Sequence, residues 1–247
     1  MSGVIHVGVS GARGRMGRAV GQVLDAREDL VVAARFDRGE TPDLSLCDVV
    51  IDFSTPDASV ELARHVAARG GPALVIGSTG LSDDQEAEIT KAAETVAIVR
   101  SGNFSLGVNI LVGLVERAAA RLDAADWDIE VLESHHRKKV DAPSGTALML
   151  GEAAAMGRHA DLAELRIAAR EGITGERPVG GIGFAALRAG GIVGDHTVLF
   201  AGTGERIEIT HKSSSRVTYA QGSLRAVRFL ADKTSGLYDM YDVLGLH

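Results

Sequence analysis

The chain has 247 residues, 45% of them hydrophobic and 24% charged, and a formal net charge of −7 at pH 7. A negative chain has no excess of cations to neutralise phosphates, which argues against a nucleic-acid or anionic-membrane partner. Its single cysteine, Cys47, excludes an intrachain disulfide and a multi-cysteine metal site. The first residues lack the apolar core of a signal peptide, and no apolar run approaches membrane-spanning length. We therefore expect a cytoplasmic protein with one large or two modest globular domains.

The first predicted strand, residues 4–9, runs into glycines at positions 11, 14 and 17 and an amphipathic helix. A glycine turn lets the backbone approach a pyrophosphate closely, and the helix N-terminus favours its negative charge. The spacing is GxxGxxG rather than GxGxxG, because position 13 is arginine. Alone, the motif also fits a glycine-rich turn that only lets the strand and the helix pack closely, without binding a dinucleotide.

A second predicted strand, residues 30–36, ends at Asp37, about 20 residues after the last glycine, where an acid typically binds the adenosine ribose. The neighbouring Arg38 is suited to pair with a 2′-phosphate. These residues strengthen the prediction of a dinucleotide site. The alternative is that Asp37 merely caps a turn.

Three further strands are expected at residues 49–53, 74–76 and 96–99, with helices at about 56–69 and 82–95. In a doubly wound sheet, loops at the C-terminal ends of the strands line the ligand crevice. The loop Gly77-Ser78-Thr79 is therefore a candidate nicotinamide-side loop, or else a plain β-to-α turn.

After residue 104 the pattern changes to an α+β block, with a long helix from about 108 to 122, a strand at 128–135 and a helix at 145–158. From about 166 we expect mostly antiparallel strands between glycine-rich turns. An amphipathic helix then returns over 215–230, so the block is interpreted as an insertion. We predict a Rossmann-type doubly wound parallel α/β sheet carrying an inserted α+β domain of mixed sheet. The dinucleotide-binding domain is assigned to 1–104 plus 216–247, and the substrate-binding and oligomerisation domain to 105–215.

Residues 135–139, His-His-Arg-Lys-Lys, end the strand at 128–135, and Thr146 begins the next predicted helix after a turn. Cations beside a helix N-terminus favour a carboxylate or phosphate. The N–H groups of Gly145 and Thr146, with the threonine hydroxyl, would clasp one carboxylate. The alternative for this cluster is a solvated basic loop.

The most specific segment is ESHHRKKVDAPSGTA, residues 133–147, accompanied by GARGRMG, IDFSTP, GSTG, SGNFSLGVN, GERPVGGIGFAALRAGGIVGDH and ERIEITHKSSSR. Together these segments resemble the 4-hydroxy-tetrahydrodipicolinate reductase (dihydrodipicolinate reductase) family essentially end to end. Two departures stand out. The connection between Arg38 and Asp48 is shorter than in many relatives, and the pair Asp37-Arg38 leaves the choice between NADH and NADPH open.

The resemblance implies NAD(P)H-dependent reduction of 4-hydroxy-2,3,4,5-tetrahydrodipicolinate to tetrahydrodipicolinate in lysine and diaminopimelate biosynthesis. It also implies a cytoplasmic homotetramer associated through the β-rich half and a small dicarboxylate substrate. No metal is expected, because the adjacent pair His135-His136 lacks the i, i+4 spacing of a helical zinc site. It makes His135 the proton donor or acceptor and Lys139 the second acid, with substrate bound by His136, Gly145 and Thr146. The cofactor-binding residues it implies are Gly11, Ala12, Arg13, Gly14, Arg15, Met16, Asp37, Arg38, Gly77, Ser78, Thr79, Ser101, Gly102, Asn103 and Phe104.

The chemistry of the residues agrees with these roles. Hydride addition to a conjugated C=C–C=N system pushes electrons toward the ring nitrogen, so a proton must reach the carbon skeleton. Histidine can hold and give that proton near neutral pH. We expect Arg137, Lys138 and Lys139 to crowd His135, and Glu133 is a candidate for orienting the histidine pair.

Several alternatives stay open. His136 has a rival interpretation as a structural histidine. His196 and His211 are expected to be satisfied surface or core histidines, and Asp141 is expected to build a turn. At the level of function, another two-domain NAD(P)-dependent dehydrogenase acting on a small carboxylate, or a non-catalytic dinucleotide sensor, would share the glycine turn. Neither would be expected to need the 133–147 segment.

Overall fold

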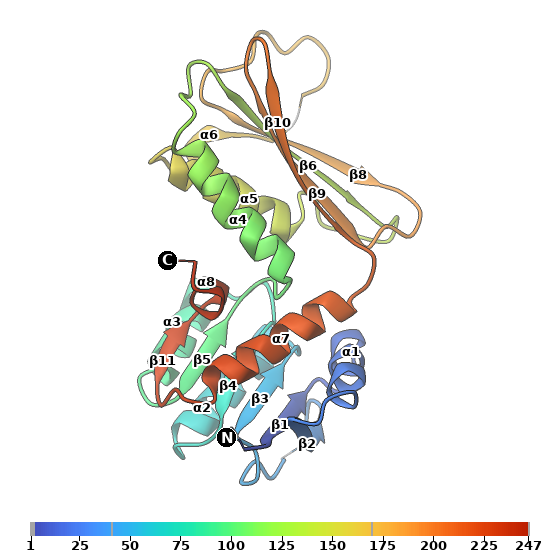
Figure 1. Cartoon of the computed structure of the whole chain (residues 1–247), viewed down its shortest axis with the longest axis vertical. Helices are drawn as coiled ribbons and strands as arrows, with labels where there is room; N and C mark the ends of the chain where they lie inside the picture. The colour runs from blue at the N-terminus through green and yellow to red at the C-terminus, as the bar shows by residue number, and fades with distance from the viewer. Residues whose placement is uncertain (1–2, 41, 169, 247) are drawn as a thin grey trace. The chain divides into compact units, whose positions relative to one another are not determined.

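The computed structural model of the chain describes residues 3–40, 42–168 and 170–246 (Figure 1). It consists of two compact units, Met1–Leu106 with Arg216–His247, and Gly107–Ser215. Among the described helices, none combines the length and the apolar character needed to cross a bilayer.

The first unit is built on a six-stranded parallel sheet in the order β11-β5-β4-β3-β1-β2. Its strands are β1 (Ile5–Ser10), β2 (Leu30–Phe36), β3 (Val49–Asp52), β4 (Ala73–Ile76), β5 (Ala97–Arg100) and β11 (Gly236–Tyr238). Its helices are α1 (Arg15–Leu24), α2 (Pro56–Ala67), α3 (Asp83–Ala92), α7 (Val217–Leu230) and α8 (Met240–Leu244). The predicted Rossmann-type sheet is confirmed. The sequence did not predict β11, a three-residue strand in the apolar tail.

Both faces of the sheet are buried at the central strands β1, β3, β4 and β5, which explains their continuous apolar runs. Because side chains alternate along a strand, Val49 and Ile51 join a core with α1, α7 and α8. Val50, between them, joins a second core with α2 and α3. Two helix starts follow the local sequence: the Thr55 side chain caps α2, and Ser82 forms a capping box with Gln85 at α3.

The second unit holds a five-stranded sheet in the order β10-β9-β6-β8-β7. Its elements are α4 (Leu106–Ala119, whose first residue lies in the first unit), β6 (Asp128–His135), α5 (Gly145–Gly157), α6 (Leu162–Leu165), β7 (Arg166–Ile167), β8 (Ile182–Arg188), β9 (Gly194–Ala201) and β10 (Arg206–Ser213). Strand β6 is antiparallel to β9 but parallel to β8, so the predicted mixed sheet is confirmed.

The expectation of mostly antiparallel strands holds for β9, which is antiparallel to β6 and β10, but not for β7 and β8. β7 and β8 run parallel to β6, because the chain crosses over through α5 before it re-enters the sheet. Strand lengths and glycine turns carry no information on this direction. The strand expected from residue 166 is also only two residues long, and part of that expectation, residue 169, lies outside the described residues.

Candidate active site

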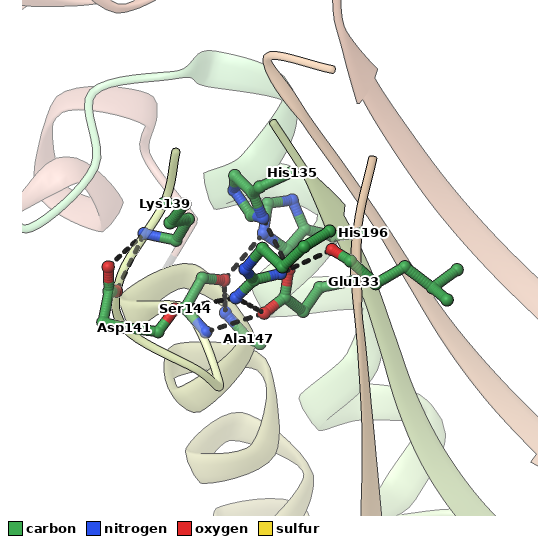
Figure 2. A network of polar contacts seen from close by, with 9 residues as sticks. Glu133, His135, Lys139, Asp141, Ser144, Ala147 and His196 are labelled. Atoms are coloured by element: carbon green, nitrogen blue, oxygen red, sulfur yellow. Dashed lines mark hydrogen bonds and ion pairs between the residues drawn. The ribbon is translucent and has the colours of Figure 1, made fainter. Parts of the chain in front are cut away.

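The end of β6 carries the histidine at the centre of the 133–147 segment. Along this strand the buried side chains alternate, so Ile129, Val131, Glu133 and His135 share one face. Helix α5 packs against this part of the sheet. The face therefore begins as apolar core. It ends with the carboxylate of Glu133 and the imidazole of His135 (Figure 2).

Glu133 is 2% exposed and is surrounded by donors. Its Oε2 lies 2.5 Å from His135 Nδ1, and the Arg188 guanidinium donates one hydrogen bond of 2.7 Å to each carboxylate oxygen. The backbone N–H of Ser144 donates to Oε1 at 3.1 Å. Burial alone would raise the pKa of Glu133, but the hydrogen bonds from Arg188, His135 and Ser144 outweigh it and hold the pKa below its ordinary value.

His196 on β9 is the second imidazole of the site. Its ring meets that of His135 edge-on, with centroids 5.1 Å apart, and its Nε2 lies 3.1 Å from Ser144 Oγ (Figure 2). Its Nδ1 has no hydrogen-bond partner among the residues that the structure describes. Burial, and then the nearby His135, lower the pKa of His196 to about 4. The expectation of a satisfied histidine is therefore wrong for His196. Only one of its ring nitrogens has a hydrogen-bond partner among the described residues, and its ring contacts that of His135.

The low pKa of His196 predicts a pH-dependent stability. Below the ordinary histidine pKa of 6.5 the unfolded chain binds a proton that the folded chain refuses until about pH 4. The free energy of unfolding should therefore fall as pH drops through this window, by at most about 3 kcal/mol from this group. Urea unfolding at pH 7 and pH 4.5 measures the loss, which His196→Gln should reduce.

The control is His159→Asn, at an exposed histidine with φ of 55°. It should lose as much free energy of unfolding between the two pH values as the wild type does. An undiminished loss in His196→Gln would contradict the assignment.

Lys139 forms an ion pair with Asp141, its Nζ lying 2.9 and 2.8 Å from the two carboxylate oxygens (Figure 2). The hydrogen bond from Lys139 lowers the pKa of Asp141, which is therefore more than the turn-builder that the sequence suggested. The expected crowding of His135 by Arg137, Lys138 and Lys139 is wrong for the first two. A carboxylate, Glu133, contacts its imidazole, while Arg137 and Lys138 are exposed.

The start of α5 lies beside this network. Ser144 is the N-cap residue, and its hydroxyl accepts a hydrogen bond from Ala147 N at 3.2 Å. Gly145 is exposed and Thr146 half-buried in the first turn. His136 is half-buried as well, and its Nδ1 is buried without a hydrogen-bond partner among the described residues.

In the first unit, the glycine turn lies between β1 and α1. Gly11 has a φ of 71°, and Gly14 is the N-cap of α1, its N–H donating to Gly11 O at 3.0 Å. The Asp37 carboxylate, at the end of β2, accepts a hydrogen bond from Arg13 N at 3.2 Å. The turn and the acid are therefore adjacent. Arg15 and Arg38 are exposed, while Ala12 and Met16 are partly buried against the core.

The loops after β4 and β5 turn several predicted cofactor side chains inward. The Ser78 hydroxyl lies 2.7 Å from Ser59 Oγ, which in turn donates to Asp52. The Phe104 ring is 1% exposed and packs edge-on against Phe53. Gly77 lies beside the same Phe53 ring, Ser101 and Asn103 bond to each other within their turn, and Thr79 and Gly102 are exposed.

Comparison with known proteins decides the family. Residues 5–104 match the family described as "Dihydrodipicolinate reductase, N-terminus", and residues 107–244 match "Dihydrodipicolinate reductase, C-terminus". The chain belongs to the dihydrodipicolinate reductase family. As a member it is an NAD(P)H-dependent oxidoreductase.

Relatives of the dihydrodipicolinate reductase family match the full length of the chain. The 4-hydroxy-tetrahydrodipicolinate reductase of Caulobacter vibrioides is 54% identical, covering 99% of both chains. That of Nitrosospira multiformis is 45% identical, covering 98% of both. Among solved structures, a dipicolinate-bound dihydrodipicolinate reductase from Paenisporosarcina sp. TG-14 has a TM-score of 0.76 at 23% identity, covering 97% of this chain and 98% of that one. A DAP dehydrogenase of C. glutamicum has a TM-score of 0.58 at 14% identity, with 98% and 96% covered. The two structures show that the fold is shared.

Arg188 and His196 lie in the segment of residues 175–196 that resembles the family, but the sequence did not predict that they are neighbours of His135. Both arrive through strand pairing: Arg188 stands opposite His135 in the parallel β6–β8 ladder, and His196 stands opposite Glu133 in the antiparallel β6–β9 ladder. Each lies more than fifty residues away along the chain. Only the register of the mixed sheet places them, and no local pattern predicts that register.

Proposed function

We propose that this chain reduces 4-hydroxy-2,3,4,5-tetrahydrodipicolinate to tetrahydrodipicolinate with NADH or NADPH, in lysine and diaminopimelate biosynthesis. The observation that carries the proposal is the full-length match to a reductase of that name, 54% identical over 99% of both chains. The alternative is another two-domain dehydrogenase acting on a small carboxylate. It has less support, because the DAP dehydrogenase structure that shares this fold is only 14% identical to the chain. It is not favoured.

In the second unit, His135 is proposed to transfer the proton and Lys139 to act as the second acid. His135 is suited to its role because a fixed carboxylate holds one of its ring nitrogens. His136, Gly145 and Thr146 are proposed to bind the dicarboxylate. The first turn of a thirteen-residue helix supports this, since N–H groups and the helix dipole at such an end favour an anion.

In the first unit, the turn from Gly11 to Met16 is proposed to hold the pyrophosphate and Asp37 the adenosine ribose. The adjacency of the Asp37 carboxylate to the Arg13 backbone supports a common adenosine-side site. The loops at 77–79 and 101–104 are proposed to surround the nicotinamide. Because the side chains of Ser78 and Phe104 point into buried contacts, these two residues would contribute through their main chain.

The domain roles follow the same division: residues 1–104 plus 216–247 bind the dinucleotide, and 105–215 bind substrate and associate with other subunits. A cytoplasmic homotetramer is proposed, assembled through the second unit. The sheet face opposite Glu133 and His135 supports this, since it exposes Leu132 by 39% and Leu187 by 62%. Apolar side chains gathered on a sheet face favour association. Sedimentation equilibrium, with Leu187→Glu as the disrupting variant, would measure the assembly.

The direct test couples the protein to the synthase that forms its substrate and follows NADH and NADPH absorbance. Oxidation that depends on both the synthase and this protein is the expected result. Reduced cofactor that is consumed with other carboxylates, but not with the synthase product, would contradict the proposal.

Cofactor choice is tested at Arg38. If its guanidinium pairs with the 2′-phosphate, Arg38→Ala should raise KM for NADPH by about tenfold or more, as expected for the loss of a charged hydrogen bond, and leave KM for NADH nearly unchanged. The control is Arg27→Ala, an exposed arginine beyond the C-terminal end of α1. Equal effects on the two cofactors would remove Arg38 from this role.

A further inference from the structure

Behind the proposed proton-transfer residue lies a buried carboxylate, Glu133, which the sequence offered only as a candidate for orienting the histidines. The Glu133 side chain is 1% exposed, and a charge so far from water is stable only when it is paired and hydrogen-bonded. Arg188 provides the pairing with two parallel hydrogen bonds. The same guanidinium also donates to the backbone oxygen of Asp141 at 2.7 Å, which links the carboxylate to the Lys139 turn.

The contact with Glu133 distinguishes the two nitrogens of His135. Nδ1 lies 2.5 Å from an ionised carboxylate, which can only accept a hydrogen bond, so Nδ1 must carry a proton. Nε2 is the nitrogen left for chemistry. A side chain at Gly194 would crowd it: a Cβ there would lie 3.1 Å from His135 Nε2 and 3.5 Å from His196 Cε1. Glycine at this position leaves that edge of the ring uncovered.

We infer that Glu133 and Arg188 are positioning residues that hold His135 in the Nδ1–H form, so that Nε2 alone exchanges the proton with substrate, and that Gly194 keeps Nε2 accessible. The inference rests on the proposed role of His135. In the step itself, the 4-hydroxyl group has left as water, hydride from the reduced nicotinamide adds to the resulting conjugated C=C–C=N system, and the proton on Nε2 passes to the carbon skeleton. The imidazolium becomes a neutral imidazole that still donates from Nδ1 to Glu133.

The charged and titratable groups around His135 fit this assignment. On its own strand it faces Glu133, from β8 it faces Arg188, and the turn between β6 and α5 brings the Lys139–Asp141 pair. From β9 it meets His196, whose lowered pKa keeps that ring neutral near pH 7. A neutral His196 neither repels the imidazolium nor competes with it as an acid. The Arg188 charge keeps Glu133 ionised, so the proton stays on the imidazole rather than moving to the carboxylate.

The decisive variant is Glu133→Gln, because a carboxamide can donate to Nδ1 as well as accept from it. Long-range ¹H–¹⁵N spectra of the ligand-free protein above the histidine titration should show His135 as Nδ1–H in the wild type and shifted toward Nε2–H in the variant. With the coupled assay, kcat should fall at least about tenfold, a part of what a general acid contributes, while KM for NAD(P)H is unchanged.

The matched control is Glu130→Gln, on the same strand. Glu130 also pairs with arginines, Arg170 and Arg177, but lies five residues from His135. It should leave both the tautomer and kcat at wild-type values. An Nδ1–H spectrum with unchanged kcat in Glu133→Gln would overturn the inference.

Two further variants keep the inference testable if Glu133→Gln does not fold. Arg188→Lys retains a charge but loses the paired hydrogen bonds, and should give a mixed tautomer with reduced kcat. Gly194→Ala should lower kcat while the Nδ1–H signal is kept, and unchanged turnover there would remove Gly194 from the inference.

The outcomes separate this inference from the proposed function. A His135→Gln variant with full turnover would refute the role of His135, whereas the tautomer reports on Glu133 without any turnover.

Discussion

Replacing His135 by glutamine is expected to lower kcat by about 10²–10⁴-fold, the usual contribution of a general acid. Glutamine preserves the approximate size and polarity of the side chain but has no nitrogen that titrates near neutral pH. Binding of NAD(P)H should be unaffected, because the cofactor residues proposed above lie in the other unit. Steady-state kinetics in the coupled assay, with fluorescence titration of the reduced cofactor, measure both quantities.

Lys139→Ala is the companion variant to His135→Gln. Loss of kcat of similar size would support a second acid, whereas a raised substrate KM alone would make Lys139 a binding residue whose partner, Asp141, only holds it in place. The control is His159→Asn, at a histidine that lies outside the network. Full turnover in His135→Gln would leave the proton transfer to another group.

The second large effect is expected at Gly17 on α1. A Cβ there would lie 2.2 Å from Gly11 O and 2.6 Å from Ala12 Cα, both backbone atoms that no side-chain rotation can move. Gly17→Ala must therefore open the glycine turn. We expect it to lower the free energy of unfolding by about 1–3 kcal/mol or more, as overpacking typically does. It should also weaken NAD(P)H binding, because the turn is the proposed pyrophosphate site. Urea unfolding and cofactor titration measure the two effects.

Gly21→Ala, one turn further along the same helix, is the matched control. The nearest atom to a Cβ there is the flexible Arg35 guanidinium, at 3.6 Å. Alanine should therefore fit and stabilise the helix by about 0.5–1 kcal/mol relative to glycine. If Gly17→Ala bound the cofactor as tightly as Gly21→Ala, the close approach within the turn would have no role in binding.

Sequence patterns predicted most of the first unit, because strands buried on both faces are continuous apolar runs that stand out from their surroundings. The strand predicted at residues 30–36 is β2 (Leu30–Phe36), and in the second unit the strand predicted at 128–135 is β6 (Asp128–His135). The misses have physical reasons. β11 is too short to have a period, and the directions of β7 and β8 depend on a crossover that local sequence does not specify.

The candidate site was predictable where its residues are close in sequence. His135, Lys139 and Thr146 lie within one twelve-residue stretch, and its signature is specific. The environment of His135 was less accessible. Glu133 was only a candidate for orienting the histidines. Arg188 and His196 lie in a segment that resembles the family, but their place beside His135 was not predicted, since a one-residue change of register would turn their side chains to the other face.

The split construction of the first unit bears on how the protein is made. Helix α7 supplies Ala220, Leu224, Val227 and Leu230 to the core that covers one face of the parallel sheet. Until the ribosome has synthesised α7, the nascent chain exposes that apolar face, even once all of the second unit has been translated. The inserted unit is therefore free to fold first. The core of the six-stranded parallel sheet is completed only after translation passes α7. Chaperones that shield apolar surface would have their greatest effect during this interval.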